Sequence, residues 1–183
     1  MVWLIGCKGM LGTEIAFQLK QNKIPFIGTD KEVDITDISA LEKFIKNVET
    51  ESYFHSEQLT RAQRQIKWII NCSAYTNVEK AEEDVELATA LNTTGPQNIA
   101  RVARNIGAKL IHISTDYVFD GTAKIPYTEN SQINPIGVYA RRLSFPYFSY
   151  KMRSTTRTVV LPLLMYLRGR LPGKAMLSLP SMR

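Results

Sequence analysis

The fold of this chain is decided by the stretch Gly6-Cys7-Lys8-Gly9-Met10-Leu11-Gly12, which follows the apolar run 2–5 and opens a segment with helical spacing. A strand, a glycine-rich turn and a helix start, in that order, are typical of a dinucleotide-binding unit. Gly6 allows a tight turn, Gly9 lets the backbone approach a pyrophosphate, and Gly12 lets the helix pack closely on the strand. The free N–H groups at the helix start would face the phosphates. The stretch therefore predicts a nucleotide-cofactor site.

A carboxylate stands where the second strand of such a unit would end. Residues 25–28 read as that strand, and Asp30 follows about 20 residues after the glycine turn, where such a unit hydrogen-bonds the adenosine ribose. Lys31 comes next and could meet a 2′-phosphate instead, so NADH and NADPH both stay open. The alternative for Asp30 is a plain turn residue.

Short apolar runs alternate with amphipathic segments along the rest of the chain. Residues 68–71 and 109–113 are nearly continuous apolar runs, as buried parallel strands are. Residues 38–48 and 85–106 carry apolar side chains at helical spacing. Residues 49–67 are polar and aperiodic, which predicts a charged surface insertion.

This alternation predicts an α/β domain with a central parallel sheet and helices on both faces. The carboxyl ends of parallel strands meet at one edge of a sheet. We therefore expect Gly6, Asp30, Asn71 and Ser114, which follow or end the four apolar runs, to converge there.

The net charge of +6 is unevenly distributed. Residues 140–183 hold nine of the 23 Lys and Arg residues and none of the 17 Asp and Glu residues, which leaves 14 basic and 17 acidic residues before them. The body of the chain is thus mildly acidic, and the basic residues do not form the mixed stripe that a nucleic-acid surface needs. We predict no nucleic-acid partner.

The sequence also argues against a membrane segment and a metal site. It contains no run of about 18 apolar residues and no basic leader followed by a long apolar one. Cys7 and Cys72 lack metal-ligand spacing and read as reduced thiols. We therefore expect a cytoplasmic protein without a metal.

Two polar residues lie within apolar segments. Asn92 falls inside the helix expected over 85–106, either as a buried hydrogen-bonding brace for the site or as an exposed residue. His112 alternates with isoleucines in a strand, which favours a packed histidine over a catalytic one.

Four segments occur in a distinctive order: the Gly6/Gly9/Gly12 turn, Asn-Cys-Ser-Ala-Tyr-Thr over 71–76, Ser-Thr-Asp-Tyr-Val-Phe-Asp-Gly over 114–121, and Pro-Ile-Gly-Val-Tyr over 135–139. Together they resemble the extended short-chain dehydrogenase/reductases, and among them the dTDP-4-dehydrorhamnose reductases. The resemblance covers residues 1–139. It implies a Rossmann-like NAD(P)-binding domain over those residues.

The resemblance also implies a reaction, the reduction of the 4-keto group of a dTDP-linked 6-deoxyhexulose by NADPH or NADH. Thr115 would hydrogen-bond the substrate carbonyl, and Tyr139 would protonate its oxygen. The implied cofactor-binding residues are Gly6, Gly9, Met10, Leu11, Gly12, Asp30, Asp34, Ile35, Ala74, Tyr75 and Thr76. The implied substrate-binding residues are Ser114, Thr115, Tyr117, Val118 and Phe119.

The chain departs from the family pattern just after Tyr139. The family has a lysine four residues later, which lowers the phenol pKa and holds the nicotinamide ribose, and this chain has Leu143. The family would read Gly-Lys-Thr-Lys-Ala where this chain reads Ala-Arg-Arg-Leu-Ser. One coding for the family version, TAT GGC AAG ACG AAG GCT TTC, reads Tyr-Ala-Arg-Arg-Arg-Leu once a single G is deleted from its second codon, which matches residues 139–142 of this chain and departs from it at Leu143.

Residues 140–183 therefore read as an anomalous basic tail, translated out of frame, with the C-terminal substrate domain missing. The absence of acidic residues and the four prolines at 146, 162, 172 and 180 agree with this interpretation. Arg142 could partly replace the lysine electrostatically. The tail is expected to pack poorly, although Val159 to Leu167 is apolar enough for a helix or strand.

The expected partner is a nucleotide-sugar substrate. The resemblance adds a homodimer in the intact family form, in which Glu14 matches a position of a metal-bridged dimer. The alternative function is a non-catalytic, reductase-like subunit such as the regulatory partner of methionine adenosyltransferase.

Overall fold

The computed structural model describes residues 1–50, 60–124, 126–128 and 131–149. A four-stranded parallel sheet in the order β2-β1-β3-β4 lies at its centre. Its strands are β1 (Val2–Ile5), β2 (Phe26–Thr29), β3 (Trp68–Asn71) and β4 (Lys109–His112). The predicted parallel sheet is confirmed.

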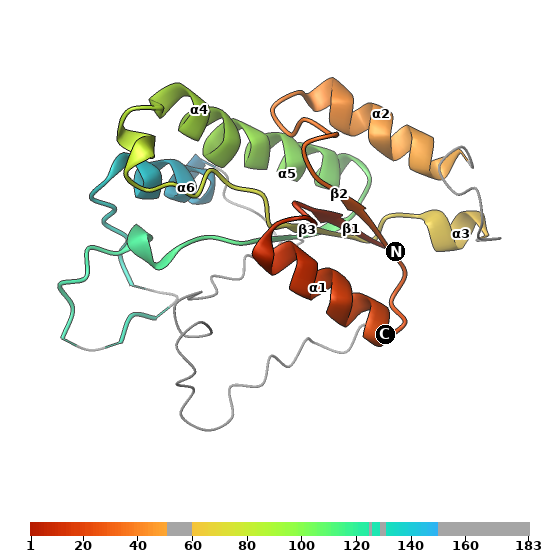
Figure 1. Cartoon of the computed structure of the whole chain (residues 1–183), viewed down its shortest axis with the longest axis horizontal. Coiled ribbons are helices and arrows are strands. Elements are labelled where there is room, and N and C mark those ends of the chain that lie inside the picture. Colours follow the sequence, from red (N-terminus) through yellow and green to blue (C-terminus); the bar gives the residue numbers. More distant parts are fainter. Residues whose placement is uncertain (51–59, 125, 129–130, 150–183) are drawn as a thin grey trace.

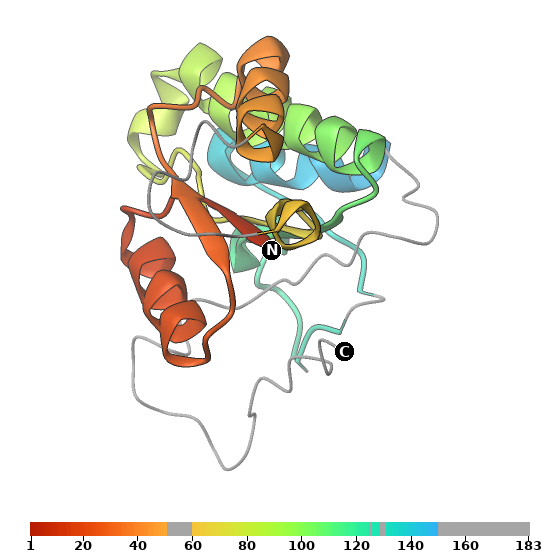
Figure 2. The ribbon, with the colours of Figure 1, turned by 90° about the vertical axis from the view of Figure 1, so that its right-hand side faces the viewer.

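Helices cover both faces of this sheet, as predicted. Helix α1 lies on one face, and α2 and α5 lie on the other (Figures 1 and 2). The helices are α1 (Met10–Gln21), α2 (Ile38–Glu49), α3 (Arg61–Arg64), α4 (Val85–Thr89), α5 (Gly95–Asn105) and α6 (Val138–Ser149), with single turns η1 (Lys80–Glu82), η2 (Ala90–Thr94) and η3 (Asp116–Val118). Within the described ranges, no helix has both the length and the apolar character needed to cross a membrane.

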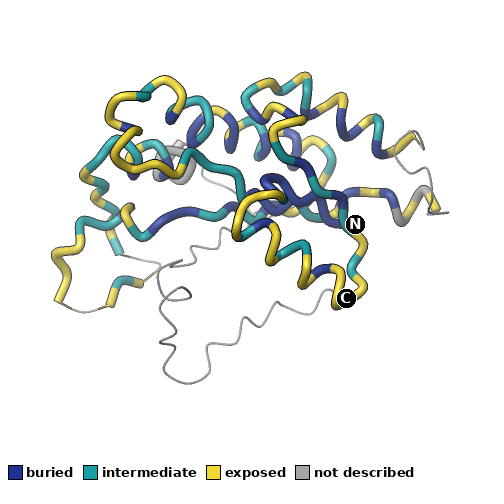
Figure 3. Tube along the Cα trace, in the orientation of Figure 1, coloured by how far each residue is buried: buried dark blue, intermediate teal, exposed yellow. Residues whose placement is uncertain are grey.

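Strand β1 supplies side chains to both layers because successive strand residues face opposite sides. Val2 and Leu4 pack with Leu19 of α1, whereas Trp3 and Ile5 join the larger cluster beneath α2 and α5. The Trp3 ring lies 4.6 Å from that of Phe44, centroid to centroid, and its indole N–H donates to the Thr29 hydroxyl at 2.9 Å. Figure 3 shows the resulting band of buried residues along the sheet.

The helix ends follow their sequence signals. Asp37 caps α2 by accepting the Ser39 N–H at 2.8 Å. Helix α5 closes in a Schellman motif: Gly107 has φ +70°, and the Ala108 N–H donates to the Ala103 carbonyl at 2.8 Å. The long helix expected over 85–106 is present as α4, η2 and α5, with a π-helical turn at η2.

The predicted surface insertion over 49–67 is wrong at its carboxyl end. Ile66 is only 2% exposed and belongs to the larger core cluster, and Arg64 is buried as well. This apolar side chain, two residues before β3, fills the core together with Ile69 of that strand. Residues 51–59 of the segment lie outside the described residues.

The expected boundary after Tyr139 falls inside α6. Ala140 and Leu143 stand three residues apart on this helix and are both buried. The expectation of poor packing is therefore wrong for these two residues, because their apolar side chains lie where α6 meets α4 and η2. Residues 150–183, including the apolar run 159–167, lie outside the described part of the chain.

Candidate active site

The carboxyl ends of all four strands meet at one edge of the sheet, as predicted. The register pairs Ile5 with Thr29 and with Asn71, and Asn71 with His112. The segments that follow these strands therefore begin side by side. Brought together here are the glycine loop, Asp30, the 72–76 segment and Ser114.

The glycine loop is tied to the neighbouring strand through its backbone. The N–H groups of Gly6 and Cys7 both donate to the Thr29 carbonyl, at 2.8 and 3.0 Å. Gly6 has φ +78°, a conformation that favours glycine. Helix α1 then begins without a side-chain cap and without an acidic residue in its first turn. Such a helix start presents backbone donors and a positive dipole end to an anion.

The three loop glycines have different neighbours. A Cβ on Gly6 would lie 2.8 Å from the Ser73 nitrogen, and one on Gly12 would lie 2.0 Å from the Gly6 carbonyl oxygen. A Cβ on Gly9 would meet nothing nearer than that same oxygen at 3.4 Å, and the φ of Gly9 is −71°. The fold thus requires glycine at 6 and 12 but not at 9, where the space that glycine leaves open is available to a ligand.

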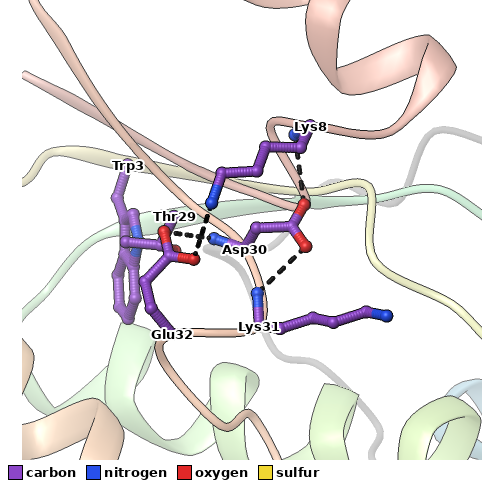
Figure 4. Close-up of polar contacts among 6 residues, drawn as sticks. All are labelled: Trp3, Lys8, Thr29, Asp30, Lys31 and Glu32. Carbon is purple, nitrogen blue, oxygen red and sulfur yellow. Dashed lines mark hydrogen bonds and ion pairs between the residues drawn. The ribbon is translucent and has the colours of Figure 1, made fainter.

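A polar network joins this loop to the end of β2 (Figure 4). The Asp30 carboxylate accepts the backbone N–H of Lys8 at 3.1 Å and that of Lys31 at 3.0 Å. The Glu32 carboxylate accepts the Asp30 N–H at 2.9 Å and the Lys8 ammonium at 3.2 Å. The sequence reasoning found Asp30 but missed Lys8 and Glu32. The signal for Lys8 was its place in the glycine loop. The signal for Glu32 was its place two positions after Asp30.

The remaining residues expected around the adenosine lie in two environments. Asp34 is exposed and accepts the N–H and hydroxyl of Thr36, both at 2.8 Å. The Ile35 side chain is buried in the core against Gly95. The reason is that an apolar residue just before α2 gains more from the core than from the surface.

Asn71 and His112 form a buried pair between the ends of β3 and β4. The Asn71 amide nitrogen lies 3.0 Å from His112 Nδ1, and its oxygen accepts both the N–H and the hydroxyl of Ser73. Burial lowers the pKa of His112 to about 4, so the ring is neutral near pH 7. The burial of His112 agrees with the packed role predicted for it. Asn71, to which the sequence assigned no role, holds His112 and Ser73 by hydrogen bonds.

Stability should fall in acid because of His112. Its folded pKa of about 4 lies below the ordinary 6.5, so the unfolded chain binds an extra proton between these values. The stabilisation is complete above pH 6.5 and is lost as the pH falls toward 4, a change of about 3 kcal/mol. Urea unfolding at a series of pH values measures it. His112→Gln should lose correspondingly less stability, and an identical loss in both proteins would contradict this assignment.

Of the two alternatives for Asn92, the structure shows the buried, hydrogen-bonded one. It is fully buried in η2, its oxygen accepts the Tyr75 N–H at 2.8 Å, and its nitrogen donates to the Tyr75 carbonyl at 3.0 Å. The Tyr75 hydroxyl in turn donates to Asp84 at 2.8 Å. The segment after β3, with Ala74, Tyr75 and Thr76, is therefore held by the helix that follows it.

Asn92→Ala should destabilise the protein by about 2 kcal/mol, since both backbone groups of Tyr75 lose their partner. Gln97→Ala, at an exposed position of α5, is the matched control and should stay within about 0.5 kcal/mol of wild type. Chemical denaturation compares the two. Equal stability of Asn92→Ala and wild type would mean that this brace is dispensable.

The two expected catalytic hydroxyls meet at the same edge. Thr115 follows β4, Tyr139 lies in the first turn of α6, and the Thr115 side chain is near enough to the phenol to lower its pKa. Burial raises the pKa of Tyr139, Asp116 and Tyr117 raise it further, and the Thr115 hydrogen bond lowers it. The phenol is thus a neutral proton donor near pH 7.

Glu82 places the helix that carries Tyr139. Its carboxylate accepts the N–H of Val138 at 2.8 Å, and a Cβ on Gly137 would lie 3.1 Å from the same oxygen. This side chain, which reaches α6 from η1, was not found by sequence reasoning. It fixes the start of the helix one residue before Tyr139.

The expected substrate-binding residues differ in how far their side chains are exposed. Tyr117 is 52% exposed, and its ring meets that of Tyr139 edge-on at 6.2 Å. Ser114 is buried, and within the described residues its hydroxyl has no hydrogen-bond partner. Val118 is buried, and Phe119 stacks on Tyr127 at 4.2 Å.

No cation of the described residues acts on Tyr139. Leu143, at the position of the family's lysine, is 2% exposed. The charges that shift the Tyr139 pKa come from Asp116 and Tyr117, and Arg142 is not among them. The partial electrostatic replacement of the lysine by Arg142 is therefore not seen among the described residues.

A parallel sheet with a glycine loop at an uncapped helix start and a Thr-Tyr pair at its carboxyl edge defines a Rossmann-like domain of the dehydrogenase/reductase class. Within that class, the family model described as RmlD substrate binding domain matches residues 1–144. The chain belongs to this family.

Its relatives agree with this assignment. A dTDP-4-dehydrorhamnose reductase of Mycobacterium tuberculosis is 36% identical over 143 residues, 75% of this chain and 41% of that protein. The crystal structure of such a reductase from Clostridium acetobutylicum matches with a TM-score of 0.72 at 35% identity, covering 87% of this chain and 52% of that one. One from Bacillus anthracis, in complex with NADP, matches with a TM-score of 0.72 at 29% identity. The chain thus spans about half the length of these relatives or less.

Proposed function

We propose that this chain carries the cofactor-binding and proton-donating half of a reductase that converts dTDP-4-dehydro-L-rhamnose to dTDP-L-rhamnose. The observation that carries the proposal is the placement of Thr115 and Tyr139 next to each other at the sheet edge that also holds the glycine loop. Relatives at 36% and 35% identity bear the name dTDP-4-dehydrorhamnose reductase, which supports this substrate.

The residues present fit a nicotinamide dinucleotide. The start of α1 offers backbone donors to a pyrophosphate, and Gly9 keeps the approach free of a side chain. Asp30 lies where a ribose hydroxyl would be held. When bound, the cofactor supplies the hydride for the carbonyl carbon. NADP in the Bacillus anthracis relative supports a cofactor of this kind.

The chain's own part in the reaction is a proton transfer. As the carbonyl carbon gains hydride, its oxygen takes the proton of the Tyr139 phenol and becomes the hydroxyl of the product. Thr115, whose single hydroxyl proton donates to Asp116 in this structure, turns that proton to the same carbonyl oxygen when the substrate binds and orients it. Asn92 holds the segment after β3, and Glu82 holds the start of α6.

The substrate assay tests this proposal. A version of the protein with the family sequence restored after Tyr139 should oxidise NADPH or NADH when dTDP-4-dehydro-L-rhamnose is added, as followed by absorbance. Tyr139→Phe removes the proton and should lower the rate by about 10²- to 10⁴-fold. A restored protein that ignores this substrate with both cofactors would refute the proposed activity.

We further propose that residues 140–183 are translated out of frame and that 1–139 are the native NAD(P)-binding domain. The acid-free composition of the tail supports this, and the family match ends five residues into the tail, at residue 144. Repeated sequencing of the gene across the codons for residues 139–144 tests it. An uninterrupted reading frame in independent reads would refute the proposed frameshift.

Location and assembly follow from the same proposal. We expect the protein to act in the cytoplasm, on a nucleotide sugar, and its intact form to be a homodimer. Glu14 is exposed on α1 and accepts a hydrogen bond from Gln18 at 2.8 Å, so it is available at a surface. The alternative of a non-catalytic regulatory subunit has no support among the relatives described above.

A further inference from the structure

The Glu32 carboxylate is held at the end of β2 from two sides. One oxygen accepts the Asp30 N–H at 2.9 Å, and the other lies 3.2 Å from the Lys8 ammonium (Figure 4). The backbone N–H groups of Glu32 and Asp30, followed by Lys8, hold the pKa of this carboxyl below its usual range. Glu32 is therefore a fixed anion beside the place where the adenosine ribose would lie.

Lys8 carries the positive charge of the glycine loop, and its ammonium group is paired with the Glu32 carboxylate. Their side chains are 70% and 44% exposed, so the ion pair is a surface contact that a stronger partner can displace. The two carboxylates of Asp30 and Glu32 balance the ammonium groups of Lys8 and Lys31. In Figure 4 the Lys31 ammonium points away from Asp30. The ribose end of the site thus has no net positive charge among these four residues.

NADH and NADPH differ only at this end of the molecule. The 2′-hydroxyl of NADH is neutral and can donate to the Asp30 carboxylate, whereas the 2′-phosphate of NADPH carries negative charge. That phosphate would meet two carboxylates and a lysine that is already paired. The negative charges of the two carboxylates oppose the binding of the phosphate. The Lys8 ammonium favours the phosphate only if Glu32 releases it.

We infer that Glu32, by holding Lys8, selects against the 2′-phosphate and is a specificity-determining residue for the cofactor. This inference rests on the proposed function, since it requires the dinucleotide to bind at this edge. It assigns the choice between NADH and NADPH to a residue beyond Asp30, and it gives the loop side chain Lys8 a role as the phosphate's partner when Glu32 is absent.

Glu32→Gln tests the inference because it removes the charge while keeping an oxygen for the Asp30 N–H. Dissociation constants for NADH and NADPH should be measured by calorimetry on the full chain. We expect the variant to bind NADPH about tenfold more tightly than wild type does and to bind NADH with a change of less than about twofold. The gain should shrink at high salt, because the groups are exposed.

Two further variants locate the effect. Adding Lys8→Met to Glu32→Gln should abolish the gain for NADPH, since the freed ammonium is then missing. Glu42→Gln, an exposed position on α2, is the matched control and should leave both constants unchanged.

The outcomes separate this inference from the proposed function. Wild type that binds neither cofactor would overturn the cofactor site and the inference with it. Wild type that binds NADH, together with a Glu32→Gln variant whose NADPH-to-NADH ratio is unchanged, would overturn the inference alone. An equal gain in Glu42→Gln would also overturn it, because the effect would then be one of overall charge.

Discussion

Gly12→Ala should destabilise this protein more than any other single methyl group added to the glycine loop. The new Cβ would lie 2.0 Å from the Gly6 carbonyl oxygen and 2.9 Å from the Cys7 Cα, both backbone atoms that cannot turn aside. Helix α1 would have to move away from the loop that Thr29 anchors through Gly6 and Cys7. We expect a loss of about 3 kcal/mol or more, from overpacking that cannot relax locally.

Gly9→Ala is the matched control for this change. It stands in the same loop, but its φ is −71° and its Cβ would meet only an ordinary contact at 3.4 Å. We expect its stability to stay within about 1 kcal/mol of wild type. Thermal and urea unfolding followed by circular dichroism compare the two variants. A Gly12→Ala protein as stable as Gly9→Ala would contradict the close packing of α1 on the loop.

The second large effect concerns catalysis. The 183-residue chain should reduce dTDP-4-dehydro-L-rhamnose at a rate too low to measure, because none of the described residues lowers the Tyr139 pKa with a positive charge. Its pKa is raised by burial, and Leu143 fills the position where the family has a lysine. Loss of a general-acid arrangement costs about 10²- to 10⁴-fold in rate.

Oxidation of NADPH, followed by its absorbance, measures this effect. The present chain is compared with the version whose family sequence is restored after Tyr139, at equal protein concentration and with both cofactors. We expect turnover only in the restored protein. A rate for the present chain close to that of the restored one would contradict both the role of the lysine and the out-of-frame origin of residues 140–183.

The sequence predicted the architecture because its signals are local. A glycine turn after a buried strand, a carboxylate after the next strand and apolar runs at regular intervals specify a parallel sheet without knowledge of distant contacts. The four strand ends meet as expected. The error at Ile66 arose because one apolar residue in a polar stretch carries no periodicity, and only the packing beside β3 reveals its burial.

The side-chain contacts of the site were less predictable. Asn92 was open between two roles until its two hydrogen bonds to the Tyr75 backbone decided it. Glu32 and Glu82 stand outside the motifs and act on backbone N–H groups within them, those of Asp30 and Val138, and a charged residue in a polar stretch looks like any surface residue. Ile35 and Val118, predicted from the family resemblance, proved to be buried. Position in a motif does not tell which way a side chain points.

The most direct test of the account is a calorimetric titration of NADH and NADPH into wild type and Gly9→Val. The structure leaves Gly9 uncrowded by the protein itself, so a side chain there should leave the fold intact and block the pyrophosphate. We predict binding heat with wild type and none with the folded variant. Equal heats for both proteins, or no heat with wild type, would contradict a dinucleotide site at this edge of the sheet.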